Sequence, residues 1–456
     1  MRRTLPTLAL LALLGALGAA AAPAQARTGI APGREFSPRQ VVVKFAGERF
    51  GRALALPAGA GVRRAAEALR RNPNVEYAEP NYVATASARD EFVLPDDPGT
   101  LGGGGGEAAA LAGDWSLKQW NFLSPEAIPG NRLPPGNRVP FSPGGIDAVG
   151  AWSNLDAAGR PGAEGVIVAV LDTGIAYRAE GQRFRRSPDF ASYQFVKGHD
   201  FVDGDPLPLD ENGHGTHVAG TIAEKTDNGI GLTGLAYRAR LMPVRVLDRR
   251  GRGDATEIAK GIRFAVAHHA RVINMSFNFG CGKRVPAVDE ALREAFAKGV
   301  VTVASAGNFG AETCVSEPAT GPRVIAVGGT TEGGCLGNYS LAGEAIDLVA
   351  PGGGTPLAGC PSVSARPIYQ VTLKPSSTRV FGIPSNYVGT SMAAAHVSGV
   401  AAMVLASGVL GPQPSPKARV DAVSRRLRTT ARDIGLPRTQ QGAGLIDAAA
   451  ATTPTP

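Results

Sequence analysis

The sequence predicts an α/β fold, a doubly wound and mostly parallel sheet with helices on both faces, preceded by a small α+β segment. Short apolar runs without a polar face recur after residue 160, as is typical of strands buried on both faces of a parallel sheet. Helical stretches separate these runs, and such alternation predicts a parallel sheet covered on both sides. The expected strands are Val166–Leu171, Leu241–Leu247, Val272–Met275, Val300–Ala304 and Val324–Val327, and the expected helices are 214–224, 255–269, 286–298, 390–407 and 415–430.

Residues 1–26 have the pattern of a secretory signal peptide. Arg2 and Arg3 precede an apolar stretch, Leu8–Leu17, and Ala24–Ala26 is a small-x-small cleavage site. An uncleaved membrane anchor is the alternative, but the apolar stretch is too short for a stable span. We therefore expect a secreted, extracellular protein without a stable membrane anchor.

Three further regions follow the signal peptide. Residues 27–83 contain an expected strand at Gln40–Phe45, an amphipathic helix at 61–71 and a strand at Asn74–Pro80. Residues 84–113 are expected to be a linker with a protease-sensitive site, because they include five consecutive glycines. The large domain is expected to span 114–452.

Charge and cysteine content restrict the partners. The net charge is +8 at pH 7, but no long Lys/Arg run with interleaved aromatic residues occurs, so nucleic-acid binding has no support. Four cysteines in an exported protein allow three disulfide connectivities. We favour the sequential pairs, each pinning a surface loop, over a metal cluster, since no CxxC pair is present. The cysteines are Cys281, Cys314, Cys335 and Cys360.

Three segments carry candidate reactive side chains. Asp172 ends an apolar strand, where α/β proteins place their sites, although it could simply be a strand-end acid. His214 lies between glycines at the start of a helix, and with His217 it has the i, i+3 spacing of a metal pair, without the acid of an HExxH motif. Ser391 follows Gly-Thr at a helix start, where serine is usually a cap.

Together, and in this order, the three segments resemble those of the subtilisin-like serine proteases over nearly all of 114–452. The resemblance implies a catalytic triad of Asp172, His214 and Ser391 that hydrolyses peptide bonds through an acyl-enzyme. It also implies that Asn308, at the end of Val303–Asn308, donates to the oxyanion together with the Ser391 backbone N–H.

The same resemblance implies a substrate-binding strand and pocket. Ser276, Phe277 and Asn278 match the strand that pairs with an extended peptide. Asn278 departs from the glycine-rich pattern of the family, which leaves the pocket width open. Gly307 and Ser316 match the opposite wall. The next residue, Glu317, either favours basic substrate side chains or points to solvent.

Calcium is the cofactor that the family resemblance implies. The loop at 227–232 resembles a tight calcium site, and hard cations need such oxygen clusters. An acidic run resembles a second, weaker site, with an ordinary acidic turn as the alternative. The implied ligands are Asp189, Asn228, Ile230, Leu232 and Gln119 for the first site and Asp200, Asp203 and Asp205 for the second.

Residues 27–83 resemble the family's inhibitory propeptide, best at 72–82. This implies a monomeric zymogen that cuts itself in the linker, with protein or peptide substrates and its own propeptide as partners. A catalytically weak binding or inhibitory protein on the same fold and a metallopeptidase using His214 and His217 are the competing hypotheses. Ala395 replaces the proline usual in the family, and alanine should give a straighter helix.

Overall fold

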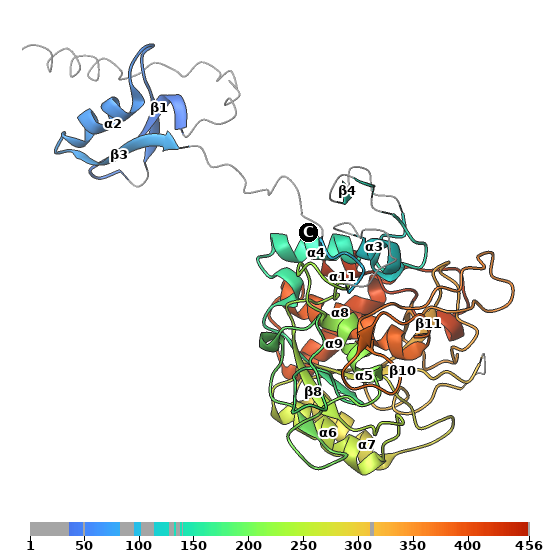
Figure 1. Cartoon of the computed structure of the whole chain (residues 1–456). Coiled ribbons are helices and arrows are strands. Elements are labelled where there is room, and N and C mark those ends of the chain that lie inside the picture. Colours follow the sequence, from blue (N-terminus) through green and yellow to red (C-terminus); the bar gives the residue numbers. More distant parts are fainter. Residues whose placement is uncertain are drawn as a thin grey trace, which may run out of the picture. The chain divides into compact units, whose positions relative to one another are not determined.

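The computed structural model describes most of the chain and divides it into two compact units, Met1–Asp90 and Glu91–Pro456 (Figure 1). We describe each unit by itself. The predicted signal peptide at 1–26 lies outside the described residues. These are 36–48, 51–82, 95–101, 114–126, 132–133, 137–138, 140–310 and 314–454.

The first unit is a three-stranded antiparallel sheet covered by one helix. Strand β1 (Phe36–Phe45) lies in the middle, between β2 (Arg52–Ala55) and β3 (Val75–Tyr82), and helix α2 (Val62–Arg70) packs on the sheet. Strand β2 was not predicted, because only one of its four residues is even half-buried. The core of this unit is small and consists of Val41, Val43, Val62, Ala66, Leu69 and Ala78.

The second unit is built on a seven-stranded sheet in which every neighbouring pair is parallel. The strand order is β12-β11-β10-β9-β6-β8-β7. The predicted parallel α/β fold is therefore confirmed, and two edge strands were not predicted. The strands are β6 (Ile167–Asp172), β7 (His199–Asp200), β8 (Arg240–Arg245), β9 (Val272–Met275), β10 (Val301–Ser305), β11 (Val324–Thr330) and β12 (Leu348–Pro351).

Helices cover both faces of this sheet. Helices α5 (His214–Ala223) and α8 (Thr390–Ser407) pack together on one face, with α4 (Ala148–Ala157) against α8. Helices α6 (Ala255–Ala267) and α7 (Pro286–Ala297) pack together on the other face (Figure 1). Among the described residues, α8 alone is long and apolar enough to cross a membrane, and 83% of it is buried in the core.

Shorter elements close the ends of the second unit. Residues 95–101, within the predicted linker, pack on it, and the Trp115 indole N–H donates to the Pro95 carbonyl over 2.8 Å. The remaining elements are α3 (Trp115–Lys118), η1 (Trp120–Phe122), β4 (Arg132–Leu133), β5 (Asn137–Arg138), η2 (Pro161–Ala163), η3 (Ser192–Gln194), β13 (Thr372–Leu373), β14 (Phe381–Gly382), α9 (Pro416–Thr429), α10 (Arg438–Gln441) and α11 (Ala448–Thr452).

The order of the strands determines where a site forms. After β6 the chain builds β7 and β8 on one side, then crosses to β9 on the other side of β6. In such sheets the crevice at the carboxyl ends of the strands flanking this crossover is the usual site. Asp172 ends β6, and β9 and β10 end at Met275 and Ser305. Three of the predicted segments therefore meet at one edge of the sheet.

Both predicted disulfides are present. Cys281 pairs with Cys314 and Cys335 with Cys360, at Cα–Cα distances of 5.8 and 6.1 Å. These distances lie in the ordinary range for a disulfide. Each bond closes a loop of a few tens of residues next to a strand end.

A buried arginine occupies the acidic run that suggested a second calcium. The Arg245 side chain is 5% exposed, and its Nη1 donates to Asp200 and Asp203 over 2.6 Å each, while Nη2 lies 3.2 Å from Glu211. Asp205 accepts from the Leu207 backbone instead. A fixed guanidinium supplies the positive charge here, so these residues do not form an oxygen cluster open to calcium.

Replacing Arg245 by alanine is expected to lower the free energy of unfolding by about 3–5 kcal/mol, because Asp200 stays buried without its partner. Arg263→Ala is the matched control, since its pair with Glu294 is about half exposed on both sides. That change is expected to cost about 1 kcal/mol or less. Urea unfolding of both variants measures the contrast, and equal losses would contradict the assigned role of Arg245.

Candidate active site

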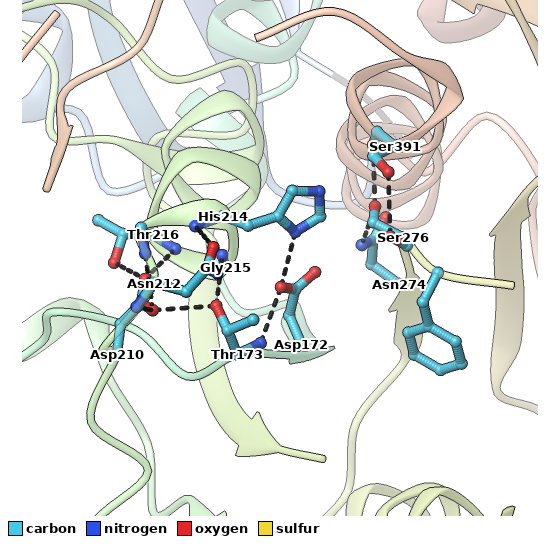
Figure 2. Close-up of polar contacts among 12 residues, drawn as sticks. Asp172, Thr173, Asp210, Asn212, His214, Gly215, Thr216, Asn274, Ser276 and Ser391 are labelled. Carbon is cyan, nitrogen blue, oxygen red and sulfur yellow. Dashed lines mark hydrogen bonds and ion pairs between the residues drawn. The ribbon is translucent and has the colours of Figure 1, made fainter. Parts of the chain in front are cut away.

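Asp172 and His214 form a hydrogen-bonded pair at the carboxyl edge of the sheet. Asp172 is fully buried, and its Oδ1 accepts from the His214 Nδ1–H over 2.8 Å and from the Thr173 backbone N–H over 2.7 Å. His214 is the first residue of α5, and its side chain is 26% exposed. Because Nδ1 is held by the carboxylate, Nε2 is the ring atom left to exchange protons (Figure 2).

A glycine lets α5 start this close to β6. A Cβ on Gly215 would lie 2.1 Å from the Gly174 carbonyl oxygen and 3.2 Å from Asp172 Oδ1. No side chain fits there without moving the helix away from the acid. The glycine after His214 in the motif thus sets the distance at which the imidazole meets Asp172.

Ser391 lies in the first turn of α8 and is 8% exposed. Its Oγ donates to the Ser276 carbonyl over 3.0 Å, and Figure 2 draws Ser391 on the same side of the His214 ring as Ser276. To act as a nucleophile, the hydroxyl must leave this carbonyl and turn to His214, as is common in sites without substrate. The structure thus holds Asp172 and His214 as a bonded pair, while the Ser391 hydroxyl bonds to the end of β9 and not to His214.

A buried chain of hydrogen bonds fixes α8 against β9. The Ser398 hydroxyl donates to Asn274 Oδ1 and the Asn274 amide donates to Ser276 Oγ, over 2.9 Å each. The Ser276 hydroxyl in turn donates to the Ser391 carbonyl over 2.8 Å. Sequence reasoning missed Asn274 and Ser398. The one signal was an asparagine inside the apolar run 272–275, whose burial requires partners.

Asn308 lies beside the start of α8. Its Oδ1 accepts from both the backbone N–H and the hydroxyl of Thr390, over 2.8 and 2.9 Å. A Cβ on Gly389 would lie 2.9 Å from Asn308 Nδ2, so the amide group is next to the turn that carries Ser391. With Oδ1 engaged, the amide presents its N–H donors, as the predicted role requires.

A second buried carboxylate, Asp210, holds the loop before His214, and sequence reasoning missed it. Asp210 is 1% exposed and accepts five hydrogen bonds. The only signal was its position four residues before the histidine, in an Asp-x-Asn-Gly turn. Its donors are the backbone N–H groups of Asn212, Gly213 and Thr216 and the hydroxyls of Thr173 and Thr216, at 2.6–3.0 Å.

The charges around His214 decide its protonation. Burial lowers the pKa of His214, but the charge and hydrogen bond of Asp172, with the charge of Asp210, outweigh it, and the pKa is raised above its usual value. Asp210 is also linked to the residue that follows β6, because the Thr173 hydroxyl donates to it and accepts from the Gly215 N–H in α5. Asp172 thus acts on the imidazole through its charge and a direct hydrogen bond. Asp210 acts through its charge and through the hydrogen bonds that hold the loop before His214.

His217 is a core residue rather than half of a metal pair. It is fully buried, its Nε2 donates to the Ile368 carbonyl over 3.0 Å, and its ring stacks on Tyr387 at 4.0 Å. Burial lowers the pKa of His217 to about 3, so the ring is neutral. Within the described ranges, no three His, Cys, Asp or Glu side chains gather to hold a metal. The described residues therefore offer no site for the metallopeptidase hypothesis.

The predicted substrate segments lie next to one another. The Phe279 N–H donates to the Glu317 carbonyl over 2.7 Å, which joins the two proposed walls. A Cβ on Gly307 would lie 3.1 Å from Ser316 Oγ. Glu317 is 5% exposed, so the alternative that it points to solvent is wrong. Burial raises its pKa despite a hydrogen bond from Thr320.

The loop at 227–232 is held by two buried carboxylates. Asp189 accepts from the Asn228 side chain over 2.7 Å and from the Leu232 N–H over 2.8 Å. Asp97, missed by sequence reasoning, accepts from the Asp227 and Asn228 N–H groups over 3.1 Å each. Gln119 does not take part, because its amide bonds the Thr233 backbone on both sides.

This loop has the chemistry of a cation site. Asp97 and Asp189 are fully buried, and burial raises the pKa of Asp97 to about 7 despite the hydrogen bonds from the Asn228 and Asp227 backbone N–H groups. Glu224 is fully buried nearby, and its Oε1 has no hydrogen-bond partner in the described part of the chain. An excess of buried carboxylate oxygens fits a hard divalent cation such as calcium. Asp97, Asp189 and Asn228 are the residues that would hold it.

Helix α8 continues without a break through Ala395, which is fully buried. The next residue, His396, lies with its Nδ1 2.8 Å from the Met392 carbonyl and its Nε2 2.8 Å from the Asn121 amide. Alanine therefore keeps the helix regular without disturbing the turn that carries Ser391.

Comparisons with known proteins agree with this geometry. The model of the Subtilase family matches residues 163–444, and a fervidolysin N-terminal prodomain matches residues 51–81. Thermitase from Thermoactinomyces vulgaris is 36% identical over 59% of this chain and 82% of that protein. A thermophilic serine proteinase from Bacillus sp. (strain AK1) is 33% identical over 75% of this chain and 66% of that protein.

A solved structure extends the comparison to the fold. A protease from Pseudoalteromonas arctica superposes with a TM-score of 0.59 at 29% sequence identity. The match covers 78% of this chain and 98% of that chain. It therefore spans more of the chain than the 163–444 family match alone.

Replacing Asp210 by asparagine is expected to lower the pKa of His214, because the change removes a negative charge that favours the imidazolium. The imidazole would then stay neutral to lower pH. NMR titration of the His214 ring measures the shift. Asp254→Asn is the control, since this acid caps α6 and does not act on His214. An unchanged His214 pKa in the Asp210 variant would contradict the assignment.

Proposed function

The chain belongs to the Subtilase family of serine endopeptidases, and on that premise we propose that it cuts proteins with Asp172, His214 and Ser391. The observation that carries the assignment is the buried Asp172–His214 pair, joined over 2.8 Å. It lies beside a serine at the start of a buried helix, and each group comes from the segment that the family pattern requires.

The proposed chemistry follows from these positions. His214 takes the Ser391 proton through Nε2 as the hydroxyl attacks the peptide carbonyl. Asp172 keeps the Nδ1–H tautomer and stabilises the imidazolium, since its carboxylate is buried and its Oδ1 faces the ring. The imidazolium then protonates the leaving amine, and water releases the acyl group from Ser391 in the second half of the cycle.

The charge on the tetrahedral intermediate is proposed to rest on donors near the start of α8. The Asn308 amide is one, because Thr390 holds its oxygen and leaves the N–H groups toward the site. The Ser391 backbone N–H is the other, at a helix N-terminus where the peptide dipoles also favour an anion.

The substrate is proposed to bind as an added strand along Ser276–Asn278. Ser276 follows β9 directly, so a peptide can extend the sheet by main-chain hydrogen bonds. Gly307 and Ser316 would form the opposite wall of the pocket for the side chain before the scissile bond. Glu317 follows Ser316 directly and is buried, and on this proposal a basic substrate side chain in the pocket would neutralise it.

Secretion as a zymogen completes the proposal. The prodomain match at 51–81 supports the predicted propeptide, and two disulfides fit an oxidising compartment. The signal pattern at 1–26 supports export. Residues 95–101 pack on the second unit, so a cut before Pro95 would leave this segment on the mature enzyme.

A fluorophosphonate probe tests the assignment of the nucleophile. We expect the purified protein to be labelled at Ser391, and Ser391→Ala to abolish both labelling and cleavage of a protein substrate. Ser407→Ala is the matched control, because this serine ends the same helix. Failure of the wild-type protein to label would favour a binding or inhibitory protein on the same fold. Intact mass before and after incubation reports self-processing separately.

Calcium removal is expected to lower the melting temperature. A ligand present at a hundred times its Kd stabilises the folded state by about 2.7 kcal/mol. We expect Asp97→Asn to lose most of this calcium-dependent shift, while Asp96→Asn keeps it, because the Asp96 side chain is exposed. Calorimetry of the Ser391→Ala protein with and without EGTA measures unfolding apart from activity. An equal shift in both variants would exclude Asp97 from the site.

A further inference from the structure

A pocket of about 640 Å³ lies beside the catalytic histidine and has no role in the mechanism above. Its walls come from the turn before His214, the turn after β8, the segment that precedes α8, and Arg183 in the loop between β6 and β7. Asn212 and Tyr387 lie at its border with the active site. The Tyr387 ring centre is 6.5 Å from that of His214.

Asn212 links one wall of this pocket to His214 by hydrogen bonds. Its Oδ1 accepts from the His214 backbone N–H over 3.1 Å, and its Nδ2 donates to the Arg249 carbonyl over 2.9 Å. The turn that carries Arg249 and Arg250 is thereby tied to the start of α5. A ligand held by this turn would lie at a fixed distance from the reacting groups.

The pocket has an excess of positive charge. Three arginines, Arg183, Arg249 and Arg250, line it against a single acid, Glu211. Glu211 is already shared between Arg183 and buried Arg245.

The other two guanidinium groups are available. Arg249 and Arg250 are exposed, and neither forms an ion pair with a carboxylate within the described ranges. The nearest acid along the chain, Asp248, accepts from the backbone N–H groups of Arg250 and Arg252. The pocket thus presents two guanidinium groups to a ligand, and guanidinium groups suit carboxylates.

The position of the pocket indicates which part of a substrate reaches it. In the proposed function, the residues before the scissile bond lie along Ser276–Asn278. His214 protonates the leaving amine, so the chain after the bond continues past His214, away from Ser276. Figure 2 draws Asn212 and Ser276 on opposite sides of the His214 ring. An extended chain advances about 3.3 Å per residue, so the first three residues after the bond pass this region.

We propose that this pocket selects substrates with an aspartate or glutamate within three residues after the scissile bond. The proposal rests on the proposed function. Arg249 and Arg250 supply the attraction, and Asn212 sets their distance from His214. The acidic side chain forms ion pairs in a half-open pocket, so we expect the preference to weaken as salt is added.

Matched fluorogenic peptides test this selection. The peptides share one sequence and carry glutamate, glutamine or lysine in turn at the first, second and third positions after the scissile bond. At one or more positions we expect kcat/KM for glutamate to exceed that for the isosteric glutamine by about two- to fivefold, with lysine lowest. The ratio should shrink between 0.05 and about 0.5 M salt.

Variants locate the effect in the pocket. The double variant Arg249→Gln and Arg250→Gln should bring the glutamate-to-glutamine ratio close to one. Arg252→Gln is the control, because this exposed arginine lies in the same turn but does not line the pocket. Melting temperatures of both variants report whether they fold.

The proposed function and this inference would fail with different experimental results. If the proposed function is wrong, the wild-type protein cuts none of the peptides. If only this inference is wrong, glutamate and glutamine peptides are cut equally at all three positions. A preference that persists in the double variant would also overturn it.

Discussion

The active site depends on a carboxylate that is buried at the end of a strand. Asp172 has no contact with solvent, and a charge in that position is costly unless donors surround it. The His214 Nδ1–H and the Thr173 N–H supply them. The first donor exists only because α5 begins where β6 ends, which the parallel order of the sheet brings about. The order of the strands in the fold therefore also sets the geometry of the proposed catalytic pair.

Two buried hydrogen-bond networks hold the rest of the site in place around Asp172 and His214. Asp210 collects five donors and holds the turn before His214, so the imidazole does not rely on Asp172 alone for its position. On the other side, Ser398, Asn274 and Ser276 join α8 to the end of β9. Each polar network is buried, and a fully satisfied buried network specifies one geometry.

Much of the fold was predictable from the sequence because its signals are local. The strands β6, β8, β9, β10 and β11 are rich in apolar residues, and the helices between them have clear starts, so these elements were predicted within a few residues. Strands β7 and β12 were missed. The two residues of β7 are too few for a pattern, and β12 pairs on one side only.

The site residues likewise divide into those that stand in sequence motifs and those that do not. Asp172, His214, Ser391 and Asn308 stand in motifs, and the structure places them around one edge of the sheet. Arg245 and Asp97 act through partners distant in sequence, so no local pattern revealed them. For Asp210, the Asp-x-Asn-Gly turn was the one local signal. The acidic run at 200–205 shows the difference, because its apparent cation ligands turn to an arginine on a neighbouring strand.

The contact between Gly215 and Gly174 limits how this protein can be stabilised. Replacing a glycine in a helix by alanine normally gains up to about 1 kcal/mol, and designers of robust enzymes use this change routinely. At Gly215 the added methyl group would meet a carbonyl oxygen at 2.1 Å. Helix α5 would have to move away from β6, and the His214 imidazole would move with it. A substitution that usually raises stability would here be expected to remove activity. Gly215 should therefore be left unchanged when helix glycines are replaced to stabilise the protein.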